Sequence, residues 1–296
     1  MTLTDWFDKL NISYFSNLNT ANISSIKVGG KAKYVAYPKT SEEFLELIKG
    51  INKISEKYKI IGGCTNTFFS DVGYNGVIIS TKQINKITFS NNVLYAEAGT
   101  SLSLLLKTAA SLGIELGSGL FGIPGTVGGA IRNNAGAHSY EIGEIFDGGY
   151  FYDLNNDRVL SLSKHEMEFS YRHSILQNEN LVFITGSFKG RIKSSEQIEN
   201  EFRETLKKRR SAHPTEPSLG SFFKRSGDII PAVLIDKAGL KGIKIGAASV
   251  STKHAGFIIN NGGATSRDVD SLAKKIEKTI SEKYNVTLMR EAEFVE

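Results

Sequence analysis

The chain has 296 residues, of which 40% are hydrophobic and 23% charged, and its formal net charge at pH 7 is +5. This composition is typical of a globular protein of two or three domains, and no apolar run is long enough for a membrane span. The single cysteine excludes an intrachain disulfide and a cysteine-rich metal site, and the first residues lack the apolar core of a signal peptide. We therefore expect a cytoplasmic protein with no membrane insertion and no metal site.

The mildly basic charge suits anionic ligands and would also suit nucleic acid. The densest basic run, residues 207–210, ends a stretch that begins with acidic residues near Glu196. A helix dipole favours acids at its start and bases at its end. The stretch is therefore predicted to be a helix with a solvated C-terminus, and we expect no nucleic-acid partner.

The first eighty residues are predicted to form a small α+β unit. Residues 1–25 are expected to give a short helix and then a polar spacer, and residues 26–37 two strands joined by a Gly-Gly turn. Thr40 and Glu43 fit a capping box before an amphipathic helix. Buried strands follow at 59–66 and 77–80.

A second α+β unit is predicted next. Strands at 84–89 and 93–98 are joined by an Asn-Asn turn, and a helix covers 101–112. A hairpin at 144–162 and a strand at 181–191 complete this unit. Because strands and helices do not alternate regularly, α+β is favoured over a doubly wound α/β fold.

The last third begins with a charged helix at 195–210, interpreted as a connector. The final helix is expected to be capped by Thr265 or Ser266, and residues 286–295 alternate like a strand. The predicted domains are residues 1–82, 83–192 and 193–296.

Residues 117–136 differ from the rest of the chain in holding seven glycines. Ordering so many glycines costs backbone entropy, and apolar residues such as Leu120 and Val127 are not typical of a mobile linker. The stretch is therefore predicted to bring its backbone, with its N–H groups, close to a ligand.

This stretch is not a dinucleotide fingerprint. Gly117, Gly119 and Gly122 do spell G-x-G-x-x-G, but the predicted helix precedes them, and Pro124 follows where a helix should run. No Gly-Lys-Ser/Thr sequence is present, which excludes a Walker A loop. A phosphate-binding loop of another kind is expected.

Four stretches in this order resemble the UDP-N-acetylenolpyruvoylglucosamine reductases, the flavoenzymes of peptidoglycan precursor synthesis. They are residues 122–137, 169–174 (Phe-Ser-Tyr-Arg-His-Ser), 217–224 (Pro-Ser-Leu-Gly-Ser-Phe-Phe-Lys), and 234–242 together with 250–260. The first alone is moderately specific, since related flavin domains carry similar loops. All four together, spanning most of the chain, are highly specific.

The resemblance implies an α+β fold with a two-lobed FAD-binding domain of the vanillyl-alcohol-oxidase (PCMH) type and a C-terminal α+β domain for the UDP-sugar. The short interval between Arg172 and Ser221 resembles the subtype that lacks an inserted tyrosine loop. The resemblance assigns non-covalent FAD binding to Gly62, Gly63, Cys64, Thr65, Asn66, Gly119, Gly122, Ile123, Pro124, Gly125, Thr126, Gly128, Gly129, Asn134, Ala135 and Gly136.

The chemistry implied by the resemblance is a two-step reduction. NADPH gives a hydride to the flavin N5 and leaves; the enolpyruvyl ether of UDP-N-acetylglucosamine then takes that hydride at its β-carbon. By resemblance, Ser221 donates a proton to the α-carbon, while Arg172 and Glu291 stabilise the enolate-like intermediate. Second-rank candidates for substrate binding are Tyr171, Lys224, Lys253 and His254.

Without the resemblance, each catalytic candidate would have an ordinary structural interpretation. Ser221 would be a turn hydroxyl, Arg172 a surface cation and Glu291 the solvent face of a strand. The chain also departs from the family pattern: Cys64 stands where glycine is usual, so it is strained if its φ is positive. Thr65 stands where serine is usual, and Glu293 occupies a position that is often basic.

Two rival functions remain open from the sequence. One is an oxygen-using sugar or alcohol oxidase on the same flavin domain; the other is a non-catalytic basic module for nucleotides or nucleic acid. The expected partners are small molecules only, namely the UDP-sugar and NADPH, and a monomer is expected.

Overall fold

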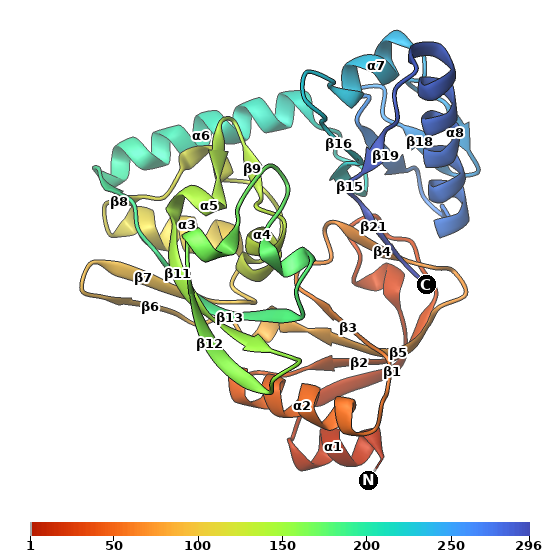
Figure 1. The fold of residues 1–296 in the computed structure, drawn as a ribbon. Helices are drawn as coiled ribbons and strands as arrows, with labels where there is room; N and C mark the ends of the chain where they lie inside the picture. Colours follow the sequence, from red (N-terminus) through yellow and green to blue (C-terminus); the bar gives the residue numbers. More distant parts are fainter. Residues whose placement is uncertain (1) are drawn as a thin grey trace. The chain divides into compact units, whose positions relative to one another are not determined.

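The computed structural model describes residues 2–296 (Figure 1). These residues form two compact units. The first unit contains the chain up to Phe15, then Val35–Gly63 and Val77–Arg209. The second unit contains Ser16–Tyr34, Cys64–Gly76 and Arg210–Glu296. The two units cut across the three predicted domains, because two early segments belong with the C-terminal third. The three-domain division therefore stays a prediction.

The first unit contains a five-stranded antiparallel sheet in the order β12–β11–β13–β7–β6. Its strands are β6 (Ile87–Ser90), β7 (Val93–Glu97), β11 (Phe146–Asp153), β12 (Arg158–Ser163) and β13 (Leu181–Phe188). The β6–β7 turn has positive φ at both Asn91 and Asn92, as a two-residue hairpin turn requires.

The helices of this part of the chain are α1 (Leu3–Lys9), α2 (Ser41–Lys53), α3 (Leu102–Ser111), α4 (Val127–Arg132), α5 (Ile142–Ile145) and α6 (Ser195–Ala212), whose last residues lie in the second unit. The apolar faces of α3 and α4 pack with the sheet residues Phe146, Phe151 and Phe188 in one buried core. Burial of these side chains, and not helix propensity, stabilises the glycine-containing α4.

The N-terminal strands form a four-stranded sheet in the order β1–β2–β5–β3, and β4, β8, β9, β10 and β14 lie in small two-stranded pairs. Their bounds are β1 (Ser13–Asn19), β2 (Lys31–Tyr37), β3 (Tyr58–Ile61), β4 (Thr67–Phe69), β5 (Tyr74–Ser80), β8 (Ile114–Glu115), β9 (Gly136–Ala137), β10 (Tyr140–Glu141) and β14 (Arg191–Ile192).

The second unit contains a four-stranded antiparallel sheet in the order β15–β19–β18–β17 and two long-range strand pairs, β16–β20 and β21–β4. Its elements are β15 (Ser218–Ser221), β16 (Phe223–Lys224), α7 (Pro231–Lys237), β17 (Lys244–Ile245), β18 (Ala248–Val250), β19 (Phe257–Asn260), α8 (Ser266–Tyr284), β20 (Met289–Arg290) and β21 (Glu293–Val295).

Specific contacts explain why early segments belong to the second unit. The Asp71 carboxylate accepts the N–H groups of Ser266 (2.8 Å) and Arg267 (3.1 Å), which satisfies the first turn of α8. The Asn260 amide donates to the carbonyls of Ile26 and Lys27 at 3.0 and 3.2 Å. Ile26, Val28 and Phe68 lie in the same buried core as the α8 face.

Most of the predicted elements are confirmed, including the helix expected at 101–112, the hairpin at 144–162 and the Thr265 cap of α8. The Thr40 side chain caps α2, which is half of the predicted capping box. The Glu43 carboxylate accepts the N–H of Lys39 at 2.7 Å, whereas in a capping box it would accept that of Thr40.

Three expectations were wrong in detail. The polar spacer before residue 25 contains β1, whose side chains are mostly exposed, so that no apolar alternation marked it. The predicted first strand at the start of 26–37 is irregular, and only β2 forms there. The C-terminal alternation is two short strands, β20 and β21, with Glu291 between them.

Candidate active site

The glycine-rich stretch, expected to be a loop, contains the six-residue helix α4. Thr126 caps it by accepting the Gly129 N–H at 3.4 Å. The N–H groups of Val127 and Gly128 donate to the carbonyls of Thr100 (2.8 Å) and Ala98 (2.9 Å). These N–H groups therefore bond to carbonyls of the first unit and not to a ligand. At this point the stretch can still bring its backbone close to a ligand.

Two of the segments predicted to bind FAD lie against each other in the first unit. A Cβ atom on Gly62 would lie 2.1 Å from the Oγ1 of Thr126, so only glycine fits at this contact. Gly122 and Gly125 have φ values of +82° and +128°, which side-chain-bearing residues rarely adopt. The sequence therefore places glycine where the backbone geometry and the contact between the two segments require it.

Helix α6 packs against the start of the glycine stretch through Arg209. Its Nε donates to the Phe121 carbonyl (3.0 Å) and its Nη2 to the Gly119 carbonyl (3.3 Å). Burial lowers the pKa of this guanidinium from its ordinary value. The Phe121 and Phe202 rings stack with centroids 4.0 Å apart. The end of this helix is thus not simply solvated, and sequence reasoning missed Arg209 because its partners lie 88 and 90 residues away.

Gly119 is buried under this contact, and its lack of a side chain has a local explanation. A Cβ there would lie 2.5 Å from the Tyr140 ring. Glycine is therefore required at this position by packing within the protein, whether or not a cofactor is nearby.

Arg172, a predicted catalytic residue, lies at the tip of a tight turn in the first unit. Ser170 and His173 exchange backbone hydrogen bonds at 3.2 and 3.0 Å, and Arg172 has a φ of +54°. Its Nη2 donates to the Gly136 carbonyl at 2.9 Å, and its guanidinium lies 5.0 Å from the centre of the exposed Tyr171 ring. A positive φ is uncommon for arginine.

The predicted catalytic residues Ser221 and Glu291 are close together along two neighbouring segments of the second unit. The Glu291 N–H donates to the Phe222 carbonyl at 2.8 Å, next in the chain to Ser221. On either side, Phe223 pairs with Arg290 and Ser221 pairs with Phe257.

Asn66, a predicted cofactor-binding residue, fixes the same segment. Its side-chain amide donates to the Glu291 carbonyl (2.9 Å), and its carbonyl accepts the Glu293 N–H (2.8 Å). The N–H and the carbonyl of Glu291 are therefore both hydrogen-bonded, which fixes its backbone. Its side chain is partly exposed.

Arg290 anchors β20 to α8. Its guanidinium donates to both carboxylate oxygens of Glu277 at 2.5 and 3.1 Å and to Asp270 at 2.6 Å, and the side chain is only 24% exposed. These charge-assisted bonds raise the pKa of Arg290, chiefly through Glu277. The residue just before Glu291 is thus held by a bidentate ion pair.

The structure places Lys253 and His254 in a bonded loop of the second unit. The Ser251 hydroxyl accepts the backbone N–H groups of both residues, and the Lys253 ammonium donates to the Arg210 carbonyl at 2.6 Å. His254 Nδ1 accepts the Gly256 N–H (3.1 Å), and burial lowers the pKa of this histidine. These contacts serve to hold the loop; a role in substrate binding stays a prediction.

Cys64 has a φ of +53°, so the condition under which we expect strain at this position is met. Its carbonyl accepts the Ser25 N–H (3.0 Å), and its thiol contacts the Thr67 carbonyl at 3.3 Å. Lys224 lies opposite Met289 in the β16–β20 pair, close in the chain to Ser221. Asn134 is fully buried, and its side chain is bonded inside the first unit.

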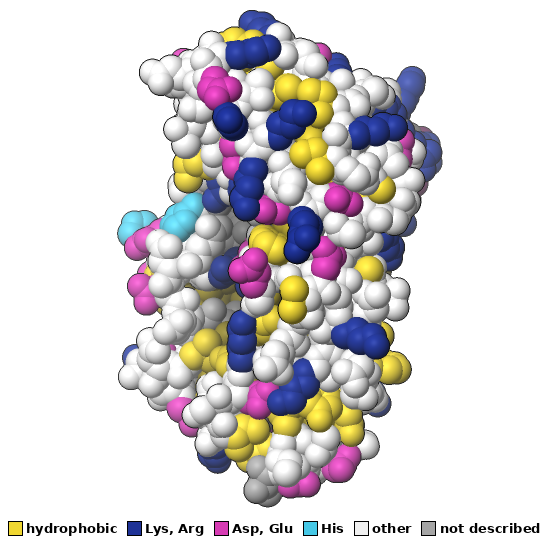
Figure 2. All heavy atoms as spheres, turned by 90° about the vertical axis from the view of Figure 1, so that its right-hand side faces the viewer, with side chains coloured by type: hydrophobic (Ala, Val, Ile, Leu, Met, Phe, Trp, Pro, Cys, Tyr) yellow, Lys and Arg dark blue, Asp and Glu magenta, His cyan; other side chains and the backbone are white. Residues whose placement is uncertain are grey.

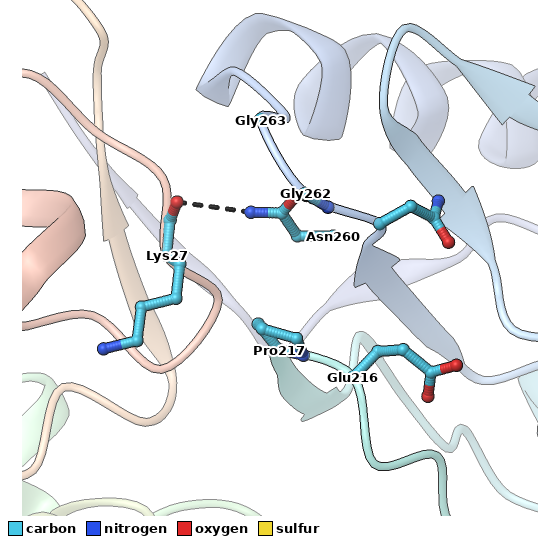
Figure 3. A pocket seen from close by; sticks show the side chains of 7 residues that line it. Lys27, Glu216, Pro217, Asn260, Gly262 and Gly263 are labelled. Atoms are coloured by element: carbon cyan, nitrogen blue, oxygen red, sulfur yellow. Dashed lines mark hydrogen bonds between the residues drawn. The ribbon is translucent and has the colours of Figure 1, made fainter.

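Each unit also has an open cavity. That of the second unit has a volume of about 500 Å³ and is lined by Lys27, Glu216, Pro217, Asn260, Asn261, Gly262 and Gly263 (Figure 3). There the Asn260 amide is turned to the Lys27 carbonyl, and its oxygen accepts the N–H groups of Gly262 and Ala264. The cavity of the first unit, about 490 Å³, includes Gly119, His138 and Tyr140.

Residues 2–296 contain neither a cluster of metal-type ligands nor a helix of membrane-spanning length and apolarity. No group of three or more His, Cys, Asp or Glu side chains is placed to hold a metal ion in this part of the chain. None of its helices is both long and apolar enough to cross a bilayer. On the face drawn in Figure 2, lysines and arginines are interspersed with acidic side chains.

Comparisons with known proteins show which families this chain resembles. The C-terminal domain model of UDP-N-acetylenolpyruvoylglucosamine reductase matches residues 212–295, and a model described as an FAD binding domain matches residues 32–148. The UDP-N-acetylenolpyruvoylglucosamine reductase of Caldicellulosiruptor saccharolyticus is 36% identical over 97% of this chain and 94% of its own.

Solved structures show the same similarity. The crystal structure of UDP-N-acetylenolpyruvylglucosamine reductase from Thermus caldophilus superimposes with a TM-score of 0.80 at 26% identity, covering 96% of this chain and 99% of that one. Glucooligosaccharide oxidase from Acremonium strictum, with a TM-score of 0.52 at 10% identity over 98% of this chain and 60% of its own, shares the fold alone. The predicted α+β fold with an FAD-binding domain is confirmed.

Proposed function

The chain belongs to the UDP-N-acetylenolpyruvoylglucosamine reductase family of FAD-dependent oxidoreductases, and from this premise we propose that it reduces the enolpyruvyl ether of UDP-N-acetylglucosamine to UDP-N-acetylmuramate. NADPH is the proposed electron donor. In the cell this reaction would supply peptidoglycan precursors, and with them cell shape and division, from the cytoplasm. The proposed enzyme acts as a monomer on small molecules.

The residues of the first unit fit a flavin. Gly62 and Thr126 bring two predicted FAD-binding segments into contact. Gly122 and Gly125 give the second segment a backbone with positive φ and no side chains at these positions. We propose that these segments hold FAD non-covalently. When bound, the flavin would accept a hydride from NADPH and deliver it to the β-carbon of the enolpyruvyl group.

Ser221 is the proposed proton donor to the α-carbon. Its side chain is exposed, and within residues 2–296 its hydroxyl makes no hydrogen bond that would compete with a substrate. The preceding Gly220 has a φ of +77°, and a Cβ there would meet open space. The hydroxyl therefore lies at the end of β15, next to a glycine with open space around it. Such a position would let a substrate carbon approach the hydroxyl.

Arg172 is proposed to bind the substrate carboxylate, into which charge spreads as the α-carbon becomes enolate-like. A guanidinium keeps its charge at all relevant pH values and matches a carboxylate in shape. One Nη of Arg172 is bonded to Gly136, which orients the fork. Glu291 is proposed to assist from the segment bonded to Phe222, sharing a hydrogen bond with the developing acid.

The observation that supports this assignment best is the hydrogen bond from the Glu291 N–H to the Phe222 carbonyl. Because Phe222 directly follows Ser221, this bond holds the proposed glutamate next to the segment that carries the proposed proton donor. Ser221 and Glu291 are distant in sequence but lie on neighbouring segments of the second unit, which supports the proposal that they act on the same substrate.

The Ser221→Ala variant tests the proposal. General acid catalysis contributes about 100-fold or more to a rate, so reoxidation of the reduced flavin by the UDP-sugar should slow by at least that factor. Reduction of the flavin by NADPH should remain close to wild type. Ser218→Ala, the same substitution in the same strand, is the matched control. Equal losses in both half-reactions of the Ser221 variant would make Ser221 a structural residue.

A further inference from the structure

The side chain of Asn134 is fully buried at the end of the glycine stretch, and its polar atoms are bonded to the protein. Its Nδ2 donates to Glu141 Oε2 (2.7 Å) and to the Ser170 carbonyl (2.8 Å), while its Oδ1 accepts the Gly143 N–H (3.1 Å). Because a carboxylate and a carbonyl only accept, the orientation of the amide follows from its neighbours. This side chain is therefore not directed at a cofactor.

One of these partners belongs to the turn that carries Arg172. The Ser170 carbonyl accepts both the Asn134 amide and the His173 N–H that closes the turn. Asn134 thus bonds the base of the turn, two residues before Arg172. The backbone of Asn134 is itself left-handed, with a φ of +40°, as asparagine tolerates better than most residues.

Further bonds join the same two segments. The Arg172 guanidinium donates to the Gly136 carbonyl, and the Gln177 amide donates both to the Arg172 carbonyl (3.0 Å) and to the Arg132 carbonyl (3.0 Å). The buried Ser174 hydroxyl also donates to the Arg132 carbonyl (2.9 Å). The end of the glycine stretch and the Arg172 turn are therefore one hydrogen-bonded body.

We propose that Asn134 is a positioning residue for Arg172, which couples the predicted flavin-binding stretch to the group that binds the substrate carboxylate. The inference rests on the proposed function and adds to it, since the family resemblance gives Asn134 only a cofactor contact. Asparagine is specifically suited to this place because the Glu141 and Ser170 acceptors need a donor, whereas the Gly143 N–H needs an acceptor.

The amide–carboxylate pair allows the structural and positioning roles to be separated. In Asn134→Asp a carboxylate of the same shape faces the Glu141 carboxylate and the Ser170 carbonyl, so both bonds are lost. In the double variant Asn134→Asp with Glu141→Gln, the amide introduced at position 141 can donate to the carboxylate introduced at position 134 and restore that bond in reverse. The repulsion between the introduced carboxylate and the Ser170 carbonyl remains. Glu141→Gln alone and Asn92→Asp, an exposed left-handed asparagine, are controls.

We expect the single variant to lower the midpoint of thermal unfolding and the double variant to recover most of it. Reoxidation of reduced flavin by the enolpyruvyl UDP-sugar should stay slow in the double variant, by about 100-fold, since displacement of an orienting group by 1 Å costs about that factor. Flavin content and reduction by NADPH should match wild type. Recovery of reoxidation together with stability would overturn the proposal and leave Asn134 purely structural.

Ligand binding provides a readout that does not depend on turnover. Calorimetry should show weaker binding of UDP-N-acetylmuramate, which carries the carboxylate, to the double variant. Binding of UDP-N-acetylglucosamine, which lacks it, should be unchanged. If the double variant binds UDP-N-acetylmuramate as tightly as wild type does, the proposal is contradicted. Loss of flavin from a folded double variant would also contradict it. A wild-type enzyme that is not reoxidised by the sugar would instead remove the proposed function, and the inference with it.

Discussion

The contact between Gly62 and Thr126 is the point where a single methyl group should most directly disturb the proposed flavin site. In Gly62→Ala the new Cβ would lie 2.1 Å from Thr126 Oγ1, far inside any van der Waals contact. Turning Thr126 about its Cα–Cβ bond would break the hydrogen bond that its Oγ1 accepts from the Gly129 N–H and would leave its Cβ 3.2 Å from the new atom. The two segments must therefore separate.

Forcing an extra methyl group into such a contact costs about 1–3 kcal/mol. If the segments separate freely without flavin but must close around it, the cost falls on binding, and about 2 kcal/mol weakens the FAD dissociation constant about 30-fold. Thr126→Ala alone removes the cap of α4 and should cost about 1 kcal/mol of stability. It also removes Oγ1, so adding Gly62→Ala to it should weaken FAD binding much less than Gly62→Ala does alone.

The assay is fluorescence titration of the apoprotein with FAD, together with thermal unfolding, for the four proteins of this double-mutant cycle. The predicted result is a large loss of FAD affinity in Gly62→Ala that Thr126→Ala partly suppresses. Additive effects, or an FAD affinity unchanged by Gly62→Ala, would refute the reasoning that this contact shapes the flavin site.

Two further predictions concern the stability that Arg209 contributes to the first unit and His254 to the second. Arg209→Met should destabilise the first unit by about 2 kcal/mol, because it leaves the Phe121 and Gly119 carbonyls without their charged donor; chemical denaturation should show this loss, and a loss equal to that of the exposed Lys207→Met would contradict it. Burial lowers the pKa of His254, so the stability this residue contributes is present above the unfolded pKa of about 6.5 and lost as the pH falls through the lower folded value. His254→Asn, which keeps an acceptor for the Gly256 N–H, should flatten the fall in unfolding midpoint below pH 6.5; an unchanged pH profile would show that His254 is not responsible.

Local sequence signals predicted much of the fold. The apolar spacing of α2, α3 and α8 and the Thr40 and Thr265 caps are properties of short windows, and these elements form where expected. Helix α4 was not predicted, because glycine has low helix propensity, and it forms by burying Val127, Ala130 and Ile131. Strand β1 was missed because most of its side chains are exposed, so its sequence shows no alternation of apolar and polar residues.

The candidate site depended on the family resemblance, since its interactions join residues far apart in the chain. Asn66 bonds Glu291 across 225 positions, Asn134 bonds Ser170 across 36, and Arg209 bonds Phe121 across 88. No local pattern records such pairs. The resemblance named the proposed reacting groups, while the hydrogen bonds of Arg290 and Asn134 near them became visible only in the folded protein.

The most direct test of the proposed function is an anaerobic absorbance experiment on the purified protein. A flavin spectrum should bleach on addition of NADPH and return on addition of the enolpyruvyl ether of UDP-N-acetylglucosamine, with UDP-N-acetylmuramate as the product. A protein that takes up no flavin even with added FAD, or a bleached flavin that only air restores, would contradict the proposed function; the second result would identify an oxidase.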